Sequence, residues 1–246
     1  MAKAKSKVAY VCTDCGSEHG QWQGQCMSCK AWNTLSQINL GASSSPAVKA
    51  DFRKQGGYAG DVSDVLNLSD IDLESLPRFT TTIGELDRVL GGGLVPGSVV
   101  LIGGNPGAGK STLLLQVMCA LAHSGKPALY VTGEESLQQV GMRAKRLQLP
   151  EDNLKLLAET NVETITKAAQ SHQPALLVVD SIQVMHSADV SSSPFSFSQF
   201  RASSAYLFQY ATQTNPFLFL LLHFTKDVNL SGPTFLVHII ACFIML

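Results

Sequence analysis

The residues with the clearest chemical signature form a glycine-rich stretch near the middle of the chain. Residues 104–111 read GNPGAGKS and fit the pattern G-x-x-x-x-G-K-[ST] at every fixed position. An apolar run at residues 99–102 precedes this stretch, and a helical pattern opens at Lys110. Strand, loop and helix in this order are the context of a phosphate-binding loop. The pattern therefore predicts a nucleotide site, and a glycine-rich turn that only joins a strand to a helix is the alternative.

The residue types explain how such a loop would hold ATP and Mg²⁺. Glycines let backbone N–H groups turn toward phosphates without a Cβ clash, and the helix N-terminus adds partial positive charge. Lys110 can reach the β- and γ-phosphates, and the Ser111 hydroxyl can ligate Mg²⁺. The predicted nucleotide-binding residues are Gly104, Asn105, Pro106, Gly107, Ala108, Gly109, Lys110, Ser111 and Thr112.

Carboxylates follow two further apolar runs that are typical of buried strands. Glu134 and Glu135 come after residues 128–132, and Asp180 comes after residues 175–179. Ligands of open α/β sheets bind at the C-terminal ends of the strands. We therefore expect one of the two glutamates to orient or deprotonate the attacking water, and Asp180 to be a further Mg²⁺ ligand. For the glutamates, the alternative is a helix start, where the dipole favours acids in the first turn.

Four of the six cysteines lie close together near the N-terminus. Cys12 and Cys15 form one C-x2-C pair, Cys26 and Cys29 form another, and ten residues separate the pairs. Two such knuckles that face each other make a tetrahedral site of four thiolates, which suits Zn²⁺. In a reducing cytosol such a cluster is more typical of a metal than of disulfides. The spacing predicts a closed, structural zinc site, with an iron site or two disulfides as alternatives.

Two tryptophans, Trp22 and Trp32, flank the knuckles. We expect them to pack over the metal, because the module is too small for a core of its own. Stacking on nucleic-acid bases is the alternative.

The overall charge excludes a global electrostatic attraction to nucleic acid. The 246 residues include 18 Lys and Arg against 19 Asp and Glu, for a net charge of −1. Binding to DNA would therefore need a local patch. The basic start of the chain is not followed by the apolar segment of a signal peptide, which predicts a cytoplasmic protein.

Changes in composition divide the chain into three predicted parts. Residues 1–35 hold the cysteines, residues 36–66 lack apolar periodicity and predict a flexible linker, and residues 67–246 hold the phosphate-binding loop. In the last part, strand-like runs alternate with helical patterns, which predicts an α/β fold with a mostly parallel, doubly wound sheet. The clearest of these helical patterns lie at residues 111–124, 136–149 and 162–171.

The helical pattern at residues 136–149 carries three basic residues, Arg143, Lys145 and Arg146. We expect them to form a solvated face, and a contact with another subunit or with DNA is the alternative.

Together these segments resemble the RadA (Sms) family of bacterial RecA-like ATPases of DNA repair and recombination. The resemblance covers residues 1–194 and rests on the cysteine knuckles and three segments: TTIGELDRVLGGGLVPGSVVLIGGNPGAGKSTLL, YVTGEES and VVDSIQVMHSADVSSSP. It implies a RecA-like core with helices on both faces of the sheet, and ATP-driven branch migration of recombination intermediates. It also implies homo-hexamers around single-stranded DNA, branched DNA as substrate, and a RecA-type recombinase as partner. By this match residues 104–111 would be the Walker A motif, Asp180 the Walker B acid, and Glu134 or Glu135 the catalytic acid.

The last 52 residues differ from the rest in composition. They hold nine of the eleven phenylalanines but few charged residues, namely Arg201, Lys226 and Asp227. The apolar runs at residues 216–224 and 235–246 are too short to span a membrane, so we expect buried strands instead.

Part of this tail still resembles the family. Residues 223–227, HFTKD, are similar to a family segment that reads G-H-V-T-K-D-G, and Lys226 is a candidate for the cation that one subunit offers to a neighbour's phosphate. The K-N-R-F-G motif and the Lon-protease-like domain of the family have no counterpart. We interpret the tail as a truncated or altered copy of the family sequence.

Three functions fit these observations. The first is an ATP-dependent motor that acts on DNA, and the second is a RecA-fold regulatory ATPase that acts on a protein partner, as circadian-clock ATPases do. The third is a zinc-anchored interaction module with an inactive ATPase. Stimulation of hydrolysis by DNA separates the first from the second, and hydrolysis that depends on Lys110 separates both from the third.

Overall fold

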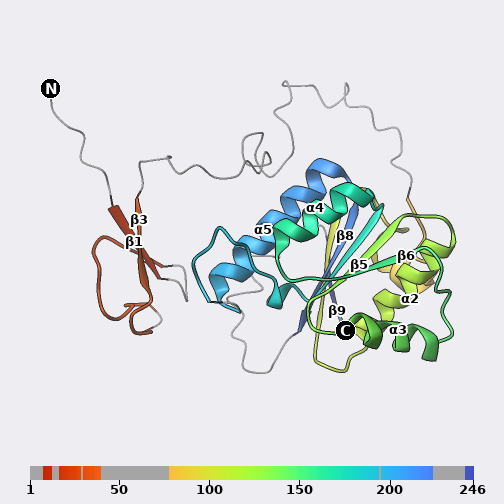
Figure 1. Cartoon of the computed structure of the whole chain (residues 1–246), viewed down its shortest axis with the longest axis horizontal. Helices are drawn as coiled ribbons and strands as arrows, with labels where there is room; N and C mark the ends of the chain where they lie inside the picture. Colours follow the sequence, from red (N-terminus) through yellow and green to blue (C-terminus); the bar gives the residue numbers. More distant parts are fainter. Residues whose placement is uncertain (1–7, 13–16, 29, 40–77, 194, 224–241) are drawn as a thin grey trace, which may run out of the picture.

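The structure is a computed structural model of the chain (Figure 1). It describes residues 8–12, 17–28, 30–39, 78–193, 195–223 and 242–246. Most of the predicted linker lies outside the described residues, and so do Cys15, Cys29 and Lys226.

The larger described part is built on a parallel six-stranded sheet (Figure 1). Its strand order is β6-β5-β7-β8-β4-β9, and each neighbouring pair is parallel. Because all the strands point the same way, their C-terminal ends meet at one edge of the sheet, where ligands of such folds bind. The strands are β4 (Val99–Gly104), β5 (Ala128–Thr132), β6 (Leu154–Ala158), β7 (Leu176–Asp180), β8 (Phe217–His223) and β9 (Cys242–Met245).

Helices cover both faces of this sheet (Figure 1). Helices α4 and α5 pack on one face, α1 and α2 pack on the other, and α3 packs against α2. This arrangement confirms the predicted α/β fold. The helical elements are α1 (Gly84–Val89), α2 (Lys110–His123), α3 (Leu137–Arg146), α4 (Val162–His172), the 3₁₀ turn η3 (Ile182–Val184) and α5 (Phe197–Thr214).

Strand β4 shows how the two apolar layers arise from one strand. Val99 and Leu101 pack with α4 and α5, whereas Val100 and Ile102 pack with α1 and α2. Because successive side chains point to opposite faces, a strand covered on both sides must be apolar at every position. The apolar run before the glycine-rich loop has this pattern, and all its residues are buried.

The phenylalanine-rich tail contributes two strands and a long helix to the core. Strand β8 lies between β7 and β4, and its first six residues are buried, which confirms the buried strand expected at residues 216–224. Of the run at 235–246, the described part forms β9 beside β4. Helix α5 was not among the predicted helices. Across the described ranges, no helix is both long and apolar enough to cross a membrane.

The smaller described part is a three-stranded antiparallel sheet with the order β2-β1-β3. Its strands are β1 (Val8–Cys12), β2 (Glu18–His19) and β3 (Leu35–Asn39). Strand β3 pairs with β1 along its whole length. The sheet therefore includes residues 36–39, which were assigned to the linker from the sequence.

Candidate active site

The glycine-rich loop connects β4 to α2 at the carboxyl edge of the sheet. Gly109 caps the helix with φ at +87°, in the left-handed region that residues with a Cβ rarely adopt. Because Lys110 and Ser111 open α2, the loop presents the N-terminus of that helix to the cavity beside it.

Most of the predicted site residues line that single cavity, whose volume is about 270 Å³. They come from the loop, from the end of β5 and from the end of β7, segments that are far apart in the sequence. These predicted residues are Pro106, Gly107, Gly109, Lys110, Ser111, Thr112, Glu134, Glu135 and Asp180. Gly104, Asn105 and Ala108 belong to the same loop but do not line the cavity.

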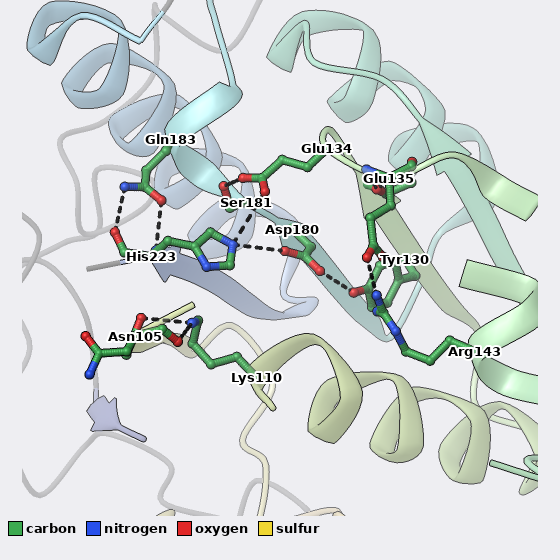
Figure 2. A network of polar contacts seen from close by, with 12 residues as sticks. Asn105, Lys110, Tyr130, Glu134, Glu135, Arg143, Asp180, Ser181, Gln183 and His223 are labelled. Atoms are coloured by element: carbon green, nitrogen blue, oxygen red, sulfur yellow. Dashed lines mark hydrogen bonds and ion pairs between the residues drawn. The ribbon is translucent and has the colours of Figure 1, made fainter. Parts of the chain in front are cut away.

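The side chain of Lys110 is folded against the loop. Its Nζ donates to the carbonyl oxygens of Gly104 and Asn105, each at 2.8 Å, and the residue is only 3% exposed (Figure 2). Burial lowers the pKa of this ammonium, and the carboxylates of Asp180 and Glu134 oppose that shift. The positive charge of Lys110 is therefore held between the loop and the carboxylates that line the cavity.

Asp180 ends β7 and is 5% exposed. Its Oδ2 accepts a hydrogen bond from the hydroxyl of Tyr130 at 2.5 Å, and its Oδ1 lies 3.9 Å from Nε2 of His223 (Figure 2). Burial, together with the negative charge of Asp180, raises the pKa of Tyr130 well above its ordinary value. The phenol therefore stays protonated and remains a donor to Asp180 at neutral pH.

Glu134 and Glu135 contact different partners in the structure, although the sequence offers no reason to distinguish them. Glu134 accepts a hydrogen bond from the Ser181 hydroxyl through Oε1, and its Oε2 lies 3.6 Å from Nε2 of His223 (Figure 2). Ser181 follows Asp180 directly, which places the Glu134 carboxylate beside the proposed Mg²⁺ ligand.

Glu135 is instead paired with Arg143 of α3 (Figure 2). Its Oε1 accepts from Nη2 of Arg143, while Glu135 Oε2 and Arg143 Nη1 are buried without a hydrogen-bond partner among the described residues. Lys145 and Arg146 are exposed, as expected for a solvated face. For Arg143 that expectation is wrong, because its side chain turns back to the carboxylate that precedes the helix.

The alternative for the two glutamates was that they are acids in the first turn of a helix, and the start of α3 shows that this is wrong. Ser136 is the N-cap: its hydroxyl accepts from the backbone N–H of Gln139 at 3.3 Å, and Gln139 Oε1 accepts from the backbone N–H of Ser136 at 2.8 Å. Glu134 and Glu135 therefore precede the helix and are not acids of its first turn.

His223, Tyr130 and Arg143 complete the cavity and its surroundings, and the sequence assigned none of them a role there. His223 ends β8, and its backbone N–H and C=O each bond the Gln183 side chain at 2.8 Å (Figure 2). The position of His223 at the end of an apolar run was a usable signal, because such positions reach the carboxyl edge of a parallel sheet.

The groups around the cavity fit a nucleotide with Mg²⁺. A buried ammonium, a helix N-terminus, a hydroxyl and carboxylate oxygens face one space, and hard oxygen donors are what Mg²⁺ prefers. Ser111 and Asp180 would hold the ion.

Cys12 ends β1, Cys26 lies between β2 and β3 in the sequence, and both are buried. The backbone N–H of Cys12 donates to Ser17 O at 3.0 Å, and that of Cys26 donates to Ala31 O at 2.9 Å. Lys30 adopts a left-handed conformation with φ at +60°, in the turn that follows the second knuckle. Two buried cysteines suit a closed metal site, while the two remaining predicted ligands lie outside the described residues.

Other polar groups lie close to these sulfurs. His19 Nε2 is 3.5 Å from Cys26 Sγ, and Thr34 Oγ1 is 3.1 Å from Cys12 Sγ. Within the described ranges, no group of three or more His, Cys, Asp and Glu residues is placed to hold a metal ion.

The two tryptophans are exposed. Trp22 is 58% exposed and Trp32 is 70% exposed, so neither ring is buried within this part of the chain.

Changing Cys12 or Cys26 to serine should release zinc from the purified chain, because a structural site needs its thiolates and supplies folding energy when filled. Metal content measured by atomic absorption checks this. Cys119→Ser is the matched control, since Cys119 is a buried cysteine of α2 that packs against α3. Stoichiometric zinc in the Cys12→Ser/Cys26→Ser double variant would contradict the four-thiolate site.

Two family models match the chain. The one described as KaiC, an ATPase, matches residues 79–173, and the one described as the rubredoxin metal binding domain matches residues 10–37. The first match contains the loop, β5 and α3, and the second contains the four cysteines of the two C-x2-C pairs.

Curated relatives of the chain carry the name DNA repair protein RadA. The protein of Escherichia coli is 56% identical over 248 residues, that of Haemophilus influenzae 54% over 247, and that of Bacillus subtilis 41% over 243. These alignments cover 100%, 100% and 98% of this chain, but 53%, 53% and 51% of the relatives. The chain thus spans about half the length of the curated relatives it matches.

Proposed function

Because the chain belongs to the RadA family of RecA-like ATPases over the part of those proteins that it spans, we propose that it hydrolyses ATP to drive the processing of DNA in repair. The proposal is supported by one observation above all. The lysine of the phosphate-binding loop, the acid at the end of β7 and a carboxylate at the end of β5 meet in one cavity.

In this proposal each group in the cavity has a distinct task. Lys110 exchanges its bonds to the loop carbonyls for bonds to the β- and γ-phosphates, and Ser111 and Asp180 hold Mg²⁺. Mg²⁺, when bound, neutralises the charge on these phosphates. Glu134 orients the attacking water and accepts its proton.

Glu134 is a better candidate for this base than Glu135. The Glu135 carboxylate is held in an ion pair with Arg143 of α3, which engages its Oε1 away from the phosphate-binding loop. The Glu134 carboxylate lies beside Ser181 and His223, next to Asp180, so a water near the terminal phosphate would be within its reach.

The proposed substrate is single-stranded and branched DNA, and the proposed reaction is branch migration together with a RecA-type recombinase. These assignments rest on the resemblance of the sequence to the RadA family, and the names of the relatives support the role in DNA repair. By the same argument the working form would be a homo-hexamer in the cytoplasm, with zinc in the small sheet.

A second candidate function is a regulatory ATPase that acts on a protein partner. The match of residues 79–173 to the family described as KaiC favours it. The cavity serves either function, because both require the same hydrolysis.

Single-stranded DNA should increase the rate of MgATP hydrolysis by the purified chain. The measurement is phosphate release with and without a homopolymeric oligonucleotide, at several salt concentrations, since contacts with DNA phosphates weaken as salt rises. Hydrolysis that is measurable but indifferent to DNA would contradict the motor and favour the regulatory ATPase.

A further inference from the structure

Tyr130 is among the largest fully buried side chains in the described ranges, and the proposed reaction gives it no task. It lies on β5, and β5 pairs with β7 so that Tyr130 is opposite Val178 and Thr132 is opposite Asp180. The Tyr130 ring packs in the apolar layer between the sheet and α2. From there its hydroxyl reaches along the neighbouring strand to Asp180.

A phenylalanine would fill this apolar layer as well as a tyrosine does. The hydroxyl adds a polar group to a buried place, and a buried polar group destabilises the fold unless it has a partner. Its partner is Oδ2 of Asp180 at 2.5 Å, and an ionised carboxylate only accepts hydrogen bonds, so Tyr130 is the donor.

This bond gives the two oxygens of Asp180 different surroundings. Oδ2 points inward to Tyr130, and Oδ1 lies on the side of His223, another residue that lines the cavity (Figure 2). With Oδ2 held, rotation of the carboxylate about its bond to Cβ is restricted. Partners of this kind orient the ligands of metal sites in proteins.

We infer that Tyr130 is a positioning residue: its hydroxyl fixes Asp180 so that Oδ1 is the oxygen offered to a divalent cation bound beside Ser111. The inference rests on the proposed function, because it assumes that a cation binds in this cavity. Tyr130 touches neither the cation nor the nucleotide and acts through Asp180 alone.

Tyr130→Phe should weaken the binding of a divalent cation in the presence of nucleotide. The probe is Mn²⁺ with ADP, and the signal is the electron paramagnetic resonance of free Mn²⁺ during a titration of the full chain. Loss of a group that orients a metal ligand typically reduces metal affinity about tenfold or more, so we expect the Mn²⁺ dissociation constant to rise about tenfold. The affinity for ADP without metal should stay unchanged, and an equal loss in both titrations would contradict the inference.

Tyr210→Phe is the matched control. Tyr210 is a buried tyrosine of α5 in the other apolar layer, and it does not line the cavity. Both Phe variants remove one buried hydroxyl, so their thermal unfolding separates a general loss of stability from a specific effect. An equal loss of Mn²⁺ affinity in Tyr130→Phe and Tyr210→Phe would overturn the inference. It would mean that the loss follows from removing any buried hydroxyl and not from an effect on Asp180.

Asp180→Asn separates a failure of this inference from a failure of the proposed function. If Asp180→Asn leaves Mn²⁺ binding unchanged, the proposed metal ligand is wrong and Tyr130 has nothing to position. If Asp180→Asn weakens Mn²⁺ binding and Tyr130→Phe does not, only the inference on Tyr130 fails. When both weaken it, adding Tyr130→Phe to Asp180→Asn should cause no further loss, and a fully additive loss would refute action through Asp180.

Discussion

Glu134→Gln should reduce ATP hydrolysis at least about 100-fold while nucleotide binding persists, since a general base typically contributes a factor of this size or more. Glutamine keeps the shape of the side chain and can still accept from Ser181. What it loses is the capacity to take a proton from water. The loss should therefore fall on kcat, and the affinity for nucleotide should change little.

The neighbouring Glu135→Gln variant is the matched control for this prediction. Glu135 is bonded to Arg143, so its replacement removes an ion pair and leaves the Arg143 guanidinium partly buried without its charge partner. We expect a lower free energy of unfolding and a smaller effect on kcat. Steady-state phosphate release and the binding of a fluorescent ATP analogue measure the two effects. Full activity of Glu134→Gln with an inactive, folded Glu135→Gln would reverse the assignment of the base.

The difference between these two glutamates shows where sequence reasoning stops. Both follow β5, and a strand pattern places both at the carboxyl edge of the sheet. Their proposed roles differ because their partners come from different segments, Ser181 for Glu134 and Arg143 for Glu135. Helical periodicity predicted that Arg143 lies on the polar side of α3, but it does not reveal that the side chain turns toward the start of its own helix.

The phosphate-binding loop and its strand were predictable because their signals are local. Four consecutive apolar residues, glycines at fixed spacing and a following helical pattern all lie within residues 99–115. The contribution of His223 depends instead on strand order. Strand β8 follows β7 in the chain and lies between β7 and β4 in the sheet, and this non-local placement brings His223 to Asp180.

Helix α5 was missed although its ends carry local signals. The Ser196 hydroxyl caps it by accepting from the N–H of Gln199, and Asn215 ends it in a left-handed conformation with φ at +60°. Its interior mixes Phe, Tyr, Ser and Gln with one charged residue, Arg201, so the polar face that usually reveals a helix is weak. The helix forms because its apolar residues, such as Leu207, are buried on the sheet.

Lys110→Ala should abolish ATP hydrolysis without changing the zinc content of the chain. The variant removes the buried ammonium that donates to the loop carbonyls. This ammonium is also attracted by the carboxylates of Asp180 and Glu134. The transferred phosphoryl group would then lose the cation that stabilises its charge in the transition state. Lys167→Ala, at an exposed lysine of α4, should retain the rate of the unaltered chain.

The metal content of Lys110→Ala tests the division of the chain into separately folding parts. The proposed zinc ligands Cys12 and Cys26 belong to the N-terminal part of the chain, whose strands form a sheet separate from the large one. If the small sheet and the large sheet fold independently, the change at Lys110 does not affect zinc binding by the cysteines. Zinc measured by atomic absorption then stays stoichiometric. Loss of zinc from a variant that still shows the circular dichroism of the large sheet and its helices would mean that the two parts fold as one unit. Residual hydrolysis in Lys110→Ala equal to that of Lys167→Ala would mean that the measured activity does not come from this cavity.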